Sequence, residues 1–258
     1  MYYKRTTYVN DVIYVQKSYN SGMINGHGLS GREKKTAEQA EKQRRHNEKM
    51  RIRNLSFLLQ ANFDLGDLNL SLHYPRGMCP DSEREAQKNV VLCLKRLKKT
   101  HPDLKYVYTT HTTERGSIHH HLIVQGAAQY EIEEAWAAVV GGGKLSAGHT
   151  LYRDRLSYKN LAAYLIADEK HKPHEKGVRA YNASKNLVRP ETEAEEVRAD
   201  RWTVPPKAPR GYRVADCVNG RDIYGAPYQI YALVPVNNDE YDINVSEYFY
   251  TGLDDDSG

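Results

Sequence analysis

The sequence predicts an α+β protein, most simply an antiparallel sheet with helices packed on one side. Two observations lead to this prediction. Segments with the alternating pattern or the Val, Thr and Tyr content of strands occur at residues 68–74, 105–111 and 117–124. Segments with helical spacing of apolar residues lie between and after them, giving the order strand, helix, strand, strand, helix, strand, helix.

The first strand and the first helix have clear boundaries. Leucines alternate with polar residues over 68–74, and Pro75 ends the strand. A helix then begins at Ser82, because Ser82 and Glu85 have the spacing of a capping box and an apolar stripe follows. The last turn of this helix is basic, which is favourable at the negative end of the helix dipole.

The remaining elements follow in order. Turn residues at 112–116 predict that the second and third strands form a hairpin. A short helix over 131–140 is stopped by three glycines. A strand near 150–152 and a helix from Ser157 to about Asp168 complete the order.

Composition favours a soluble protein. Hydrophobic residues make up 40% of the 258, and no apolar run approaches the roughly 18 residues that a membrane helix needs. Met1–Arg5 begins no hydrophobic signal core, so we expect no membrane partner and a cytoplasmic location. The three cysteines are odd in number and widely spaced, which indicates packing residues rather than disulfides or a thiolate metal site.

Charge divides the chain, whose net charge is +4, into a basic body and an acidic end. Residues 191–258 hold 6 basic and 14 acidic residues, a net charge of −8, which leaves +12 for residues 1–190. A basic body suits a partner with a phosphate backbone, although surface charge also serves solubility alone.

These changes in charge and composition along the sequence predict that the chain has three parts. Residues 1–53 form an N-terminal extension, loosely ordered up to residue 31 and then a basic arm. The arm, residues 32–53, has nine Lys or Arg against four Glu, so it is expected to order against the core or nucleic acid, or to be a solvated helix. Residues 54–190 form the α+β domain, and residues 191–258 form an acidic, proline-containing tail.

The third strand, Ser-Ile-His-His-His-Leu-Ile-Val at 117–124, holds the candidate metal ligands. Alternate side chains of a strand share a face, so His119 and His121 project together while His120 points the other way. Two imidazoles on one face can bind a metal ion. The alternative is an exposed or hydrogen-bonded histidine pair without a metal.

A third ligand depends on the hairpin register. If His111 pairs opposite His119, three imidazoles lie on one face and can hold one divalent ion. A shift of one residue would turn His111 away. Glu114 in the turn and, more distantly, His73 are the other candidates.

The helix from Ser157 offers two tyrosines. Tyr158 lies on the apolar stripe and is expected in the core. Tyr164 lies on a polar stripe, so its hydroxyl can reach solvent or a substrate. The chain has 20 tyrosines, so packing is the ordinary role of any one of them, but Tyr164 stands on a helix that follows the histidine strand.

The chain resembles the rolling-circle replication-associated proteins of bacterial plasmids, integrative elements and small DNA phages. These are a branch of the HUH endonucleases, which cut single-stranded DNA with a tyrosine. The matching segments cover roughly residues 40–190 in family order. They are residues 61–63, 66–74, 106–110 through 121–124, 161–165 and 184–187.

The resemblance implies a ferredoxin-like or RRM-like sheet, metal-binding histidines at His119 and His121, a Mg²⁺ or Mn²⁺ cofactor, and Tyr164 as the nucleophile. The metal would bind the scissile phosphate while Tyr164 attacks the phosphorus, giving a 5′-phosphotyrosine and a free 3′-hydroxyl. A tyrosine with a pKa of about 10 is a poor nucleophile near neutrality, so the metal or a lysine must favour the phenolate.

Two departures from the family pattern matter. Where the family often carries a glutamate ahead of the histidine strand, this chain has His111, which suits Mn²⁺ or another transition metal better than Mg²⁺. The family usually has a lysine three or four residues after the tyrosine, where this chain has Ala167 and Asp168. Lys170 is the expected substitute, with Lys172 and Lys159 as alternatives.

The expected partners are single-stranded origin DNA, a helicase and a DNA polymerase. The chain has no Walker-type phosphate loop, so unwinding would need a separate helicase. The expected phosphate contacts are Lys95, Lys98, Lys99, Arg44, Arg45, Arg51 and Arg53. Alternatives are a non-catalytic RRM-like nucleic-acid-binding protein, a metal-dependent hydrolase without a covalent intermediate, and a relaxase or transposase of the same HUH class.

Overall fold

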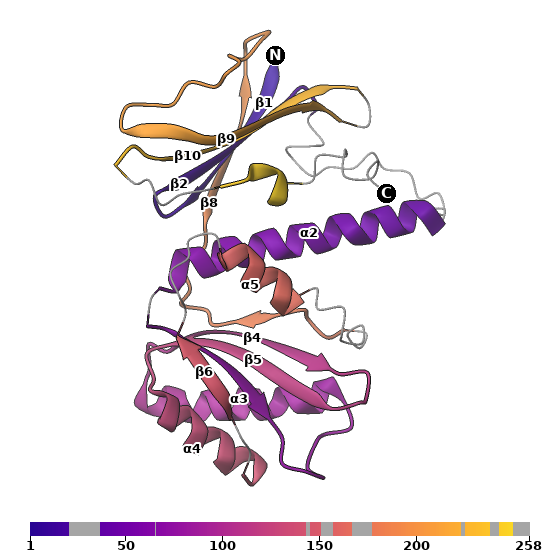
Figure 1. Ribbon diagram of the computed structural model, residues 1–258, viewed down its shortest axis with the longest axis vertical. Helices are drawn as coiled ribbons and strands as arrows, with labels where there is room; N and C mark the ends of the chain where they lie inside the picture. The colour runs from indigo at the N-terminus through magenta and orange to yellow at the C-terminus, as the bar shows by residue number, and fades with distance from the viewer. Residues whose placement is uncertain are drawn as a thin grey trace. The chain divides into compact units, whose positions relative to one another are not determined.

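The computed structural model describes residues 1–20, 37–64, 66–142, 145–150, 157–166, 177–222, 225–237 and 243–249 (Figure 1). The chain divides into two compact units. The first combines Met1–Ala61, Tyr158–Ala162 and Arg189–Gly258, and the second combines Asn62–Ser157 and Ala163–Val188. Each is built on one five-stranded antiparallel sheet, so the predicted α+β class is confirmed.

The second unit contains the sheet β6-β3-β5-β4-β7, in which all neighbouring strands are antiparallel. Its strands and main helices are β3 (Leu68–His73), α3 (Glu83–Thr100), β4 (Lys105–Thr112), β5 (Ile118–Gln125), α4 (Gln129–Val140), β6 (Leu145–Thr150) and β7 (Asn182–Ala183). The order β3-α3-β4-β5-α4-β6 is that of the ferredoxin-like motif. Figure 1 shows α3 and α4 on the same face of this sheet.

Apolar side chains hold α3 and α4 against that face. Alternate residues of the central strands, such as Leu72 of β3 and Leu122 of β5, point to the helices. They are buried together with Val90, Cys93, Leu94 and Leu97 of α3 and Ile132, Trp136 and Val140 of α4. The helix start predicted at Ser82 is confirmed, since Ser82 Oγ accepts a hydrogen bond from Glu85 N at 3.2 Å.

The first unit contains the sheet β8-β1-β2-β10-β9. Its elements are β1 (Tyr2–Val9), β2 (Val12–Ser18), α2 (Ala37–Asn62), β8 (Glu191–Val197), β9 (Tyr212–Arg221), β10 (Pro227–Pro235) and the short 3-10 helix η1 (Val245–Glu247). Its core includes an aromatic stack in which Tyr14 of β2 lies 4.6 Å from Phe57 of α2, centroid to centroid. Tyr248 and Phe249 pack against both rings.

The predicted division of the chain needs correction. Residues 1–20 are a hairpin rather than loosely ordered, and the expected acidic tail supplies three strands of the same sheet. β8 is an exposed edge strand, where acidic side chains are tolerated, and one of its carboxylates, Glu195, pairs with Lys4 of β1 at 2.8 Å. The boundary predicted at residue 53 falls inside α2, and the second unit begins at Asn62.

Smaller differences concern element ends. The strand expected near 150–152 is β6, which ends at Thr150, while Tyr152 lies outside the described residues. The helix predicted to reach Asp168 is α5 (Ser157–Ile166), and Asp168 also lies outside the described residues. No helix in the described part of the chain is both long enough and apolar enough to cross a membrane.

His120 lies on the helix-facing side of β5, as predicted, and is fully buried. Its Nδ1 lies 2.9 Å from Thr110 Oγ1, and its Nε2 lies 2.9 Å from the Tyr74 hydroxyl. That hydroxyl donates to the backbone oxygen of Ala86 at 3.2 Å. Burial lowers the pKa of His120 to about 3, and the neighbouring histidine His119 acts in the same direction. The imidazole is therefore neutral in the folded protein.

This neutral histidine makes stability depend on pH. An unfolded histidine takes up a proton near pH 6.5, whereas folded His120 does not, so the folded state loses stability as the pH falls below about 6.5, by up to about 1.4 kcal/mol per pH unit. His120→Gln removes this proton uptake, and the free energy of unfolding should fall less steeply on acidification. Denaturant unfolding between about pH 7 and pH 4 measures the two slopes. Equal slopes in the two proteins would contradict the prediction.

Candidate active site

Four histidines share the sheet face opposite α3 and α4. β4 pairs with β5 so that His111 lies opposite His119, and β3 pairs with β5 so that His73 lies opposite His119. Directly paired residues share a face, and His121 follows His119 by two residues, so all four project together. The predicted hairpin register is confirmed.

Three of these imidazoles form a compact group. The ring centroids are 5.1 Å apart for His119 and His121, 5.3 Å for His111 and His121, and 5.7 Å for His111 and His119. The fourth histidine, His73, stacks on His119, with ring centroids 5.6 Å apart and ring planes 17° apart. His111 and His121 are buried, whereas His119 and His73 are half-buried. The group therefore has a buried end and an accessible end.

Hydroxyl groups of the same sheet hold two of the rings. His111 Nε2 lies 2.9 Å from Thr109 Oγ1, and His121 Nδ1 lies 3.1 Å from Ser71 Oγ. Within the described residues, no group of three or more His, Cys, Asp or Glu side chains is placed so that it could hold a metal ion as it stands. The donors nevertheless match a transition metal in chemistry, because imidazole suits such ions and ligating histidines commonly hydrogen-bond through the second ring nitrogen.

Tyr164 stands beside this group. Its hydroxyl lies 3.4 Å from His121 Nε2, and the two rings are 5.0 Å apart at 70°. The side chain is 48% exposed, whereas that of Tyr158, earlier on α5, is 5% exposed. The prediction that Tyr158 is a core residue is confirmed, and Tyr164 is exposed, as its polar stripe predicted.

The structure describes only some of the other residues predicted for the candidate active site. Lys170 and Lys172 lie outside the described residues, while Lys159 is half-buried on α5. Glu114 is exposed in the turn between β4 and β5. The third imidazole of the compact group comes from His111, so the described group consists of imidazoles and contains no carboxylate.

The lysines predicted to contact DNA lie away from the histidines. Lys95 and Lys99 are exposed on α3, which covers the opposite face of the sheet. Lys98 Nζ lies 5.2 Å from the ring centre of Tyr106, at the start of β4, whereas the histidine of β4 is near its end. A DNA segment bound by these lysines would be distinct from one lying on the histidine face.

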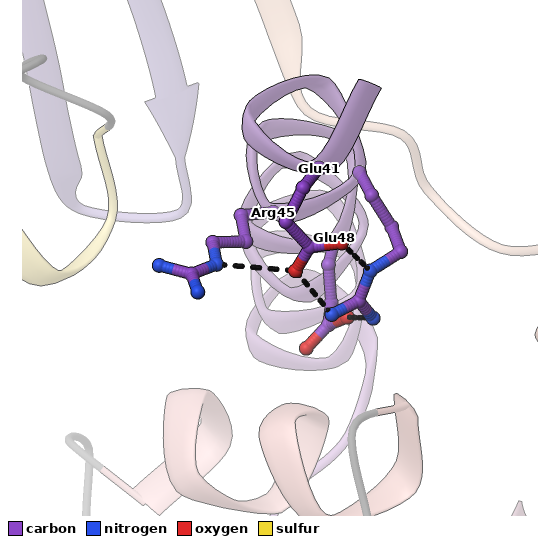
Figure 2. A network of polar contacts seen from close by, with 4 residues as sticks. Glu41, Arg45 and Glu48 are labelled. Atoms are coloured by element: carbon purple, nitrogen blue, oxygen red, sulfur yellow. Dashed lines mark hydrogen bonds and ion pairs between the residues drawn. The ribbon is translucent and has the colours of Figure 1, made fainter. Parts of the chain in front are cut away.

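The arginines predicted to contact DNA are on α2. Figure 2 shows Arg45 beside Glu41, and Arg44 also pairs with Glu41 at 2.7 Å. Hydrogen bonds from Arg44 lower the pKa of Glu41 to about 2. Arg51 is exposed, but Arg53 lies 5.1 Å above the ring of Phe249. Burial lowers the pKa of Arg53 to about 10, so Arg53 is a packing residue of the first unit, unlike the exposed arginines.

Sequence reasoning missed Ser71 and Thr109, which hydrogen-bond to the histidine rings. A signal for both was present. Ser71 precedes His73 by two residues and Thr109 precedes His111 by two, so the strand period places each on the histidine face. What the sequence does not show is which hydroxyl meets which ring nitrogen, because that depends on pairing between strands.

Comparison with protein-family models, with curated proteins and with solved structures finds no match to this chain.

The different surroundings of the two tyrosines predict different effects on stability. Tyr164→Phe removes one hydroxyl from an exposed side chain and should change the free energy of unfolding by no more than about 0.5 kcal/mol. Tyr158→Ala empties a buried position and should cost about 3–5 kcal/mol. Denaturant unfolding of the two variants tests this. A large loss in Tyr164→Phe would show that Tyr164 is a packing residue.

Proposed function

We propose that this protein nicks and rejoins single-stranded DNA as a single-tyrosine nuclease of the HUH class. The observation that carries the proposal is the 3.4 Å contact between the Tyr164 hydroxyl and His121 Nε2. An accessible tyrosine oxygen beside a group of imidazoles is the arrangement that a covalent phosphoryl transfer needs, with a nucleophile next to groups that can hold a metal ion. The resemblance of residues 40–190 to the rolling-circle proteins supports the same reaction.

In the proposed reaction the Tyr164 oxygen attacks the phosphorus of one phosphodiester. The bond from phosphorus to the 3′-oxygen of the upstream nucleotide breaks, and that oxygen takes up a proton to become a free 3′-hydroxyl. The proton of Tyr164 passes to water, which its exposed side chain can contact. The downstream strand stays linked to Tyr164 through its 5′-phosphate. Attack by a 3′-hydroxyl on this link reverses the step and rejoins DNA without ATP.

The proposed cofactor is a divalent metal ion, Mn²⁺ or Mg²⁺, held by His119 and His121 with His111 as the third ligand. When bound, such an ion would neutralise negative charge on the phosphate oxygens. The imidazole donors favour Mn²⁺ or another transition metal over Mg²⁺. His73 stacks on His119 and so supports the ring of a proposed ligand.

The biological role that we propose is initiation of rolling-circle replication. The free 3′-hydroxyl can prime a polymerase, and a separate helicase would unwind the duplex. Relaxases and transposases of the same class use the same chemistry, and the resemblance favours the replication proteins. The exposed cations of α2 and α3 are proposed to contact DNA phosphates.

Metal binding is testable without DNA. Calorimetric titration with Mn²⁺ should show one site, and His119→Ala and His121→Ala should each weaken it by more than about tenfold because a ligand is lost. His111→Ala tests the third ligand. His101→Gln is the matched control, since His101 pairs with Glu131 at the end of α3 and should not affect the site. Equal losses in the control, or no binding by the wild type, would contradict the metal site.

The covalent link is testable with a pool of single-stranded oligonucleotides that have a randomised centre and a 3′ label. With Mn²⁺ or Mg²⁺, the wild type should form a labelled protein–DNA adduct that survives denaturing electrophoresis, and mass spectrometry should place the link on Tyr164. Tyr164→Phe should lose the adduct by at least about 100-fold, because the nucleophile is absent. Tyr130→Phe, at an exposed tyrosine of α4, is the matched control.

Other outcomes identify the alternative functions. An adduct in Tyr164→Phe at the wild-type level would rule out this nucleophile. Cleavage that needs the histidines but not Tyr164 would indicate a hydrolase without a covalent intermediate. Binding without cleavage, unchanged in His119→Ala and His121→Ala, would indicate a non-catalytic nucleic-acid-binding protein.

A further inference from the structure

We propose that Ser71 is a positioning residue whose hydroxyl holds the His121 ring with Nε2, rather than Nδ1, directed at the Tyr164 hydroxyl. This inference rests on the proposed function, because it gives Ser71 a part in the same reaction. Ser71 is proposed to act only through His121, without contacting Tyr164 or the substrate.

The backbone fixes the relation between Ser71 and His121. The two residues pair directly across β3 and β5, and Ser71 Oγ lies 3.1 Å from His121 Nδ1. Both strands are interior to the sheet, since β3 lies between β6 and β5, and β5 between β3 and β4. The serine side chain has one rotatable bond before its oxygen, and His121 is 4% exposed. Direct strand pairing thus places the hydroxyl next to a buried ring.

This hydrogen bond fixes the orientation of the ring, and its direction is linked to the position of the ring proton, because the serine hydroxyl can accept from Nδ1–H or donate to an unprotonated Nδ1. A neutral imidazole carries its proton on one nitrogen and offers a lone pair on the other. When Nδ1–H donates to Ser71 Oγ, the lone pair is on Nε2, the nitrogen 3.4 Å from the Tyr164 hydroxyl. Nε2 can then accept a hydrogen bond from Tyr164 or bind an ion. Without Ser71, the ring can flip or carry its proton on Nε2.

The neighbouring histidines show the same construction. Thr109 Oγ1 lies 2.9 Å from His111 Nε2, and Thr110 Oγ1 lies 2.9 Å from His120 Nδ1. Threonine and serine hydroxyls thus hold rings on both faces of the hairpin. His121 combines such a contact with a contact to Tyr164, so loss of Ser71 should affect the chemistry more directly than loss of a hydroxyl that holds only a core ring.

The test compares Ser71→Ala with the wild type in two independent measurements. The first is ¹⁵N NMR of metal-free protein labelled at histidine, with the His121 signals assigned by His121→Gln. The wild type should show a protonated Nδ1 and an unprotonated Nε2, and Ser71→Ala should show a mixture or the reverse. The second is the rate of adduct formation with the oligonucleotide pool, which should fall about 10- to 100-fold, as for other residues that orient a ligand or base. The KM should stay within about twofold, because substrate contacts remain.

Three further variants serve as controls for Ser71→Ala. Ser71→Thr retains the hydroxyl and should restore both the tautomer and the rate. Ser71→Cys has nearly the same size with a weak hydrogen-bonding group, so it should reproduce the alanine effect without leaving a cavity. Ser246→Ala removes a half-buried serine hydroxyl in the first unit and should match the wild type.

The two measurements separate failure of this inference from failure of the proposed function. The NMR measurement uses no DNA, so an altered His121 tautomer in Ser71→Ala and Ser71→Cys supports the positioning role even if the wild type forms no adduct. An unaltered tautomer in both variants overturns that role. If the wild type forms the adduct and both variants react at its rate, the part of Ser71 in the reaction is overturned while the proposed nuclease stands.

Discussion

The pairing register of β4 and β5 is the constraint on which the site depends. A shift of one residue would turn His111 to the opposite face and move every side chain of one strand to the other side of the sheet. The turn between the strands fixes this register: Thr113 and Ser117 are joined by a backbone hydrogen bond of 2.9 Å, and Gly116 closes the turn with a φ of 84°. A side chain at Gly116 would strain that conformation, so a residue outside the site controls its geometry.

The same strand serves the core and the site. His120 faces α3 and α4 as a neutral, hydrogen-bonded core residue, while His119 and His121 face the other way. A polar residue in a packed core is tolerated because both ring nitrogens have partners, and those partners also join β4 and the residue that follows β3 to β5. The rings of His119 and His121 on the site face therefore project from a rigid strand. This rigidity lets one hydroxyl, such as that of Ser71, determine how a ring is presented.

Local patterns predicted the second unit well. The alternation of leucines predicted β3, and the capping residue Ser82 predicted the start of α3. The two-residue period of a strand predicted which face of the sheet His119, His120 and His121 each lie on. The sheet of the first unit was missed because β1 pairs with β8, about 190 residues later, and such pairing leaves no local period. The Asn10-Asp11 turn, with φ of 53° at Asn10, was a usable hairpin signal. The charge of β8 suggested a tail because edge strands are protected by the same exposed carboxylates.

The chemical character of the site follows from its imidazole donors. Carboxylate ligands would bring negative charge toward a DNA phosphate, whereas His111, His119 and His121 add none when neutral. In the proposed reaction this favours approach of the phosphodiester, and it weakens the hold on a hard ion such as Mg²⁺. The oxygen of Tyr164 lies next to His121, so a phosphate bound to the proposed metal ion would come within reach of the proposed nucleophile. In the proposed reaction, imidazole ligands and an exposed tyrosine are thus complementary: the first would admit the anionic strand, and the second would attack it.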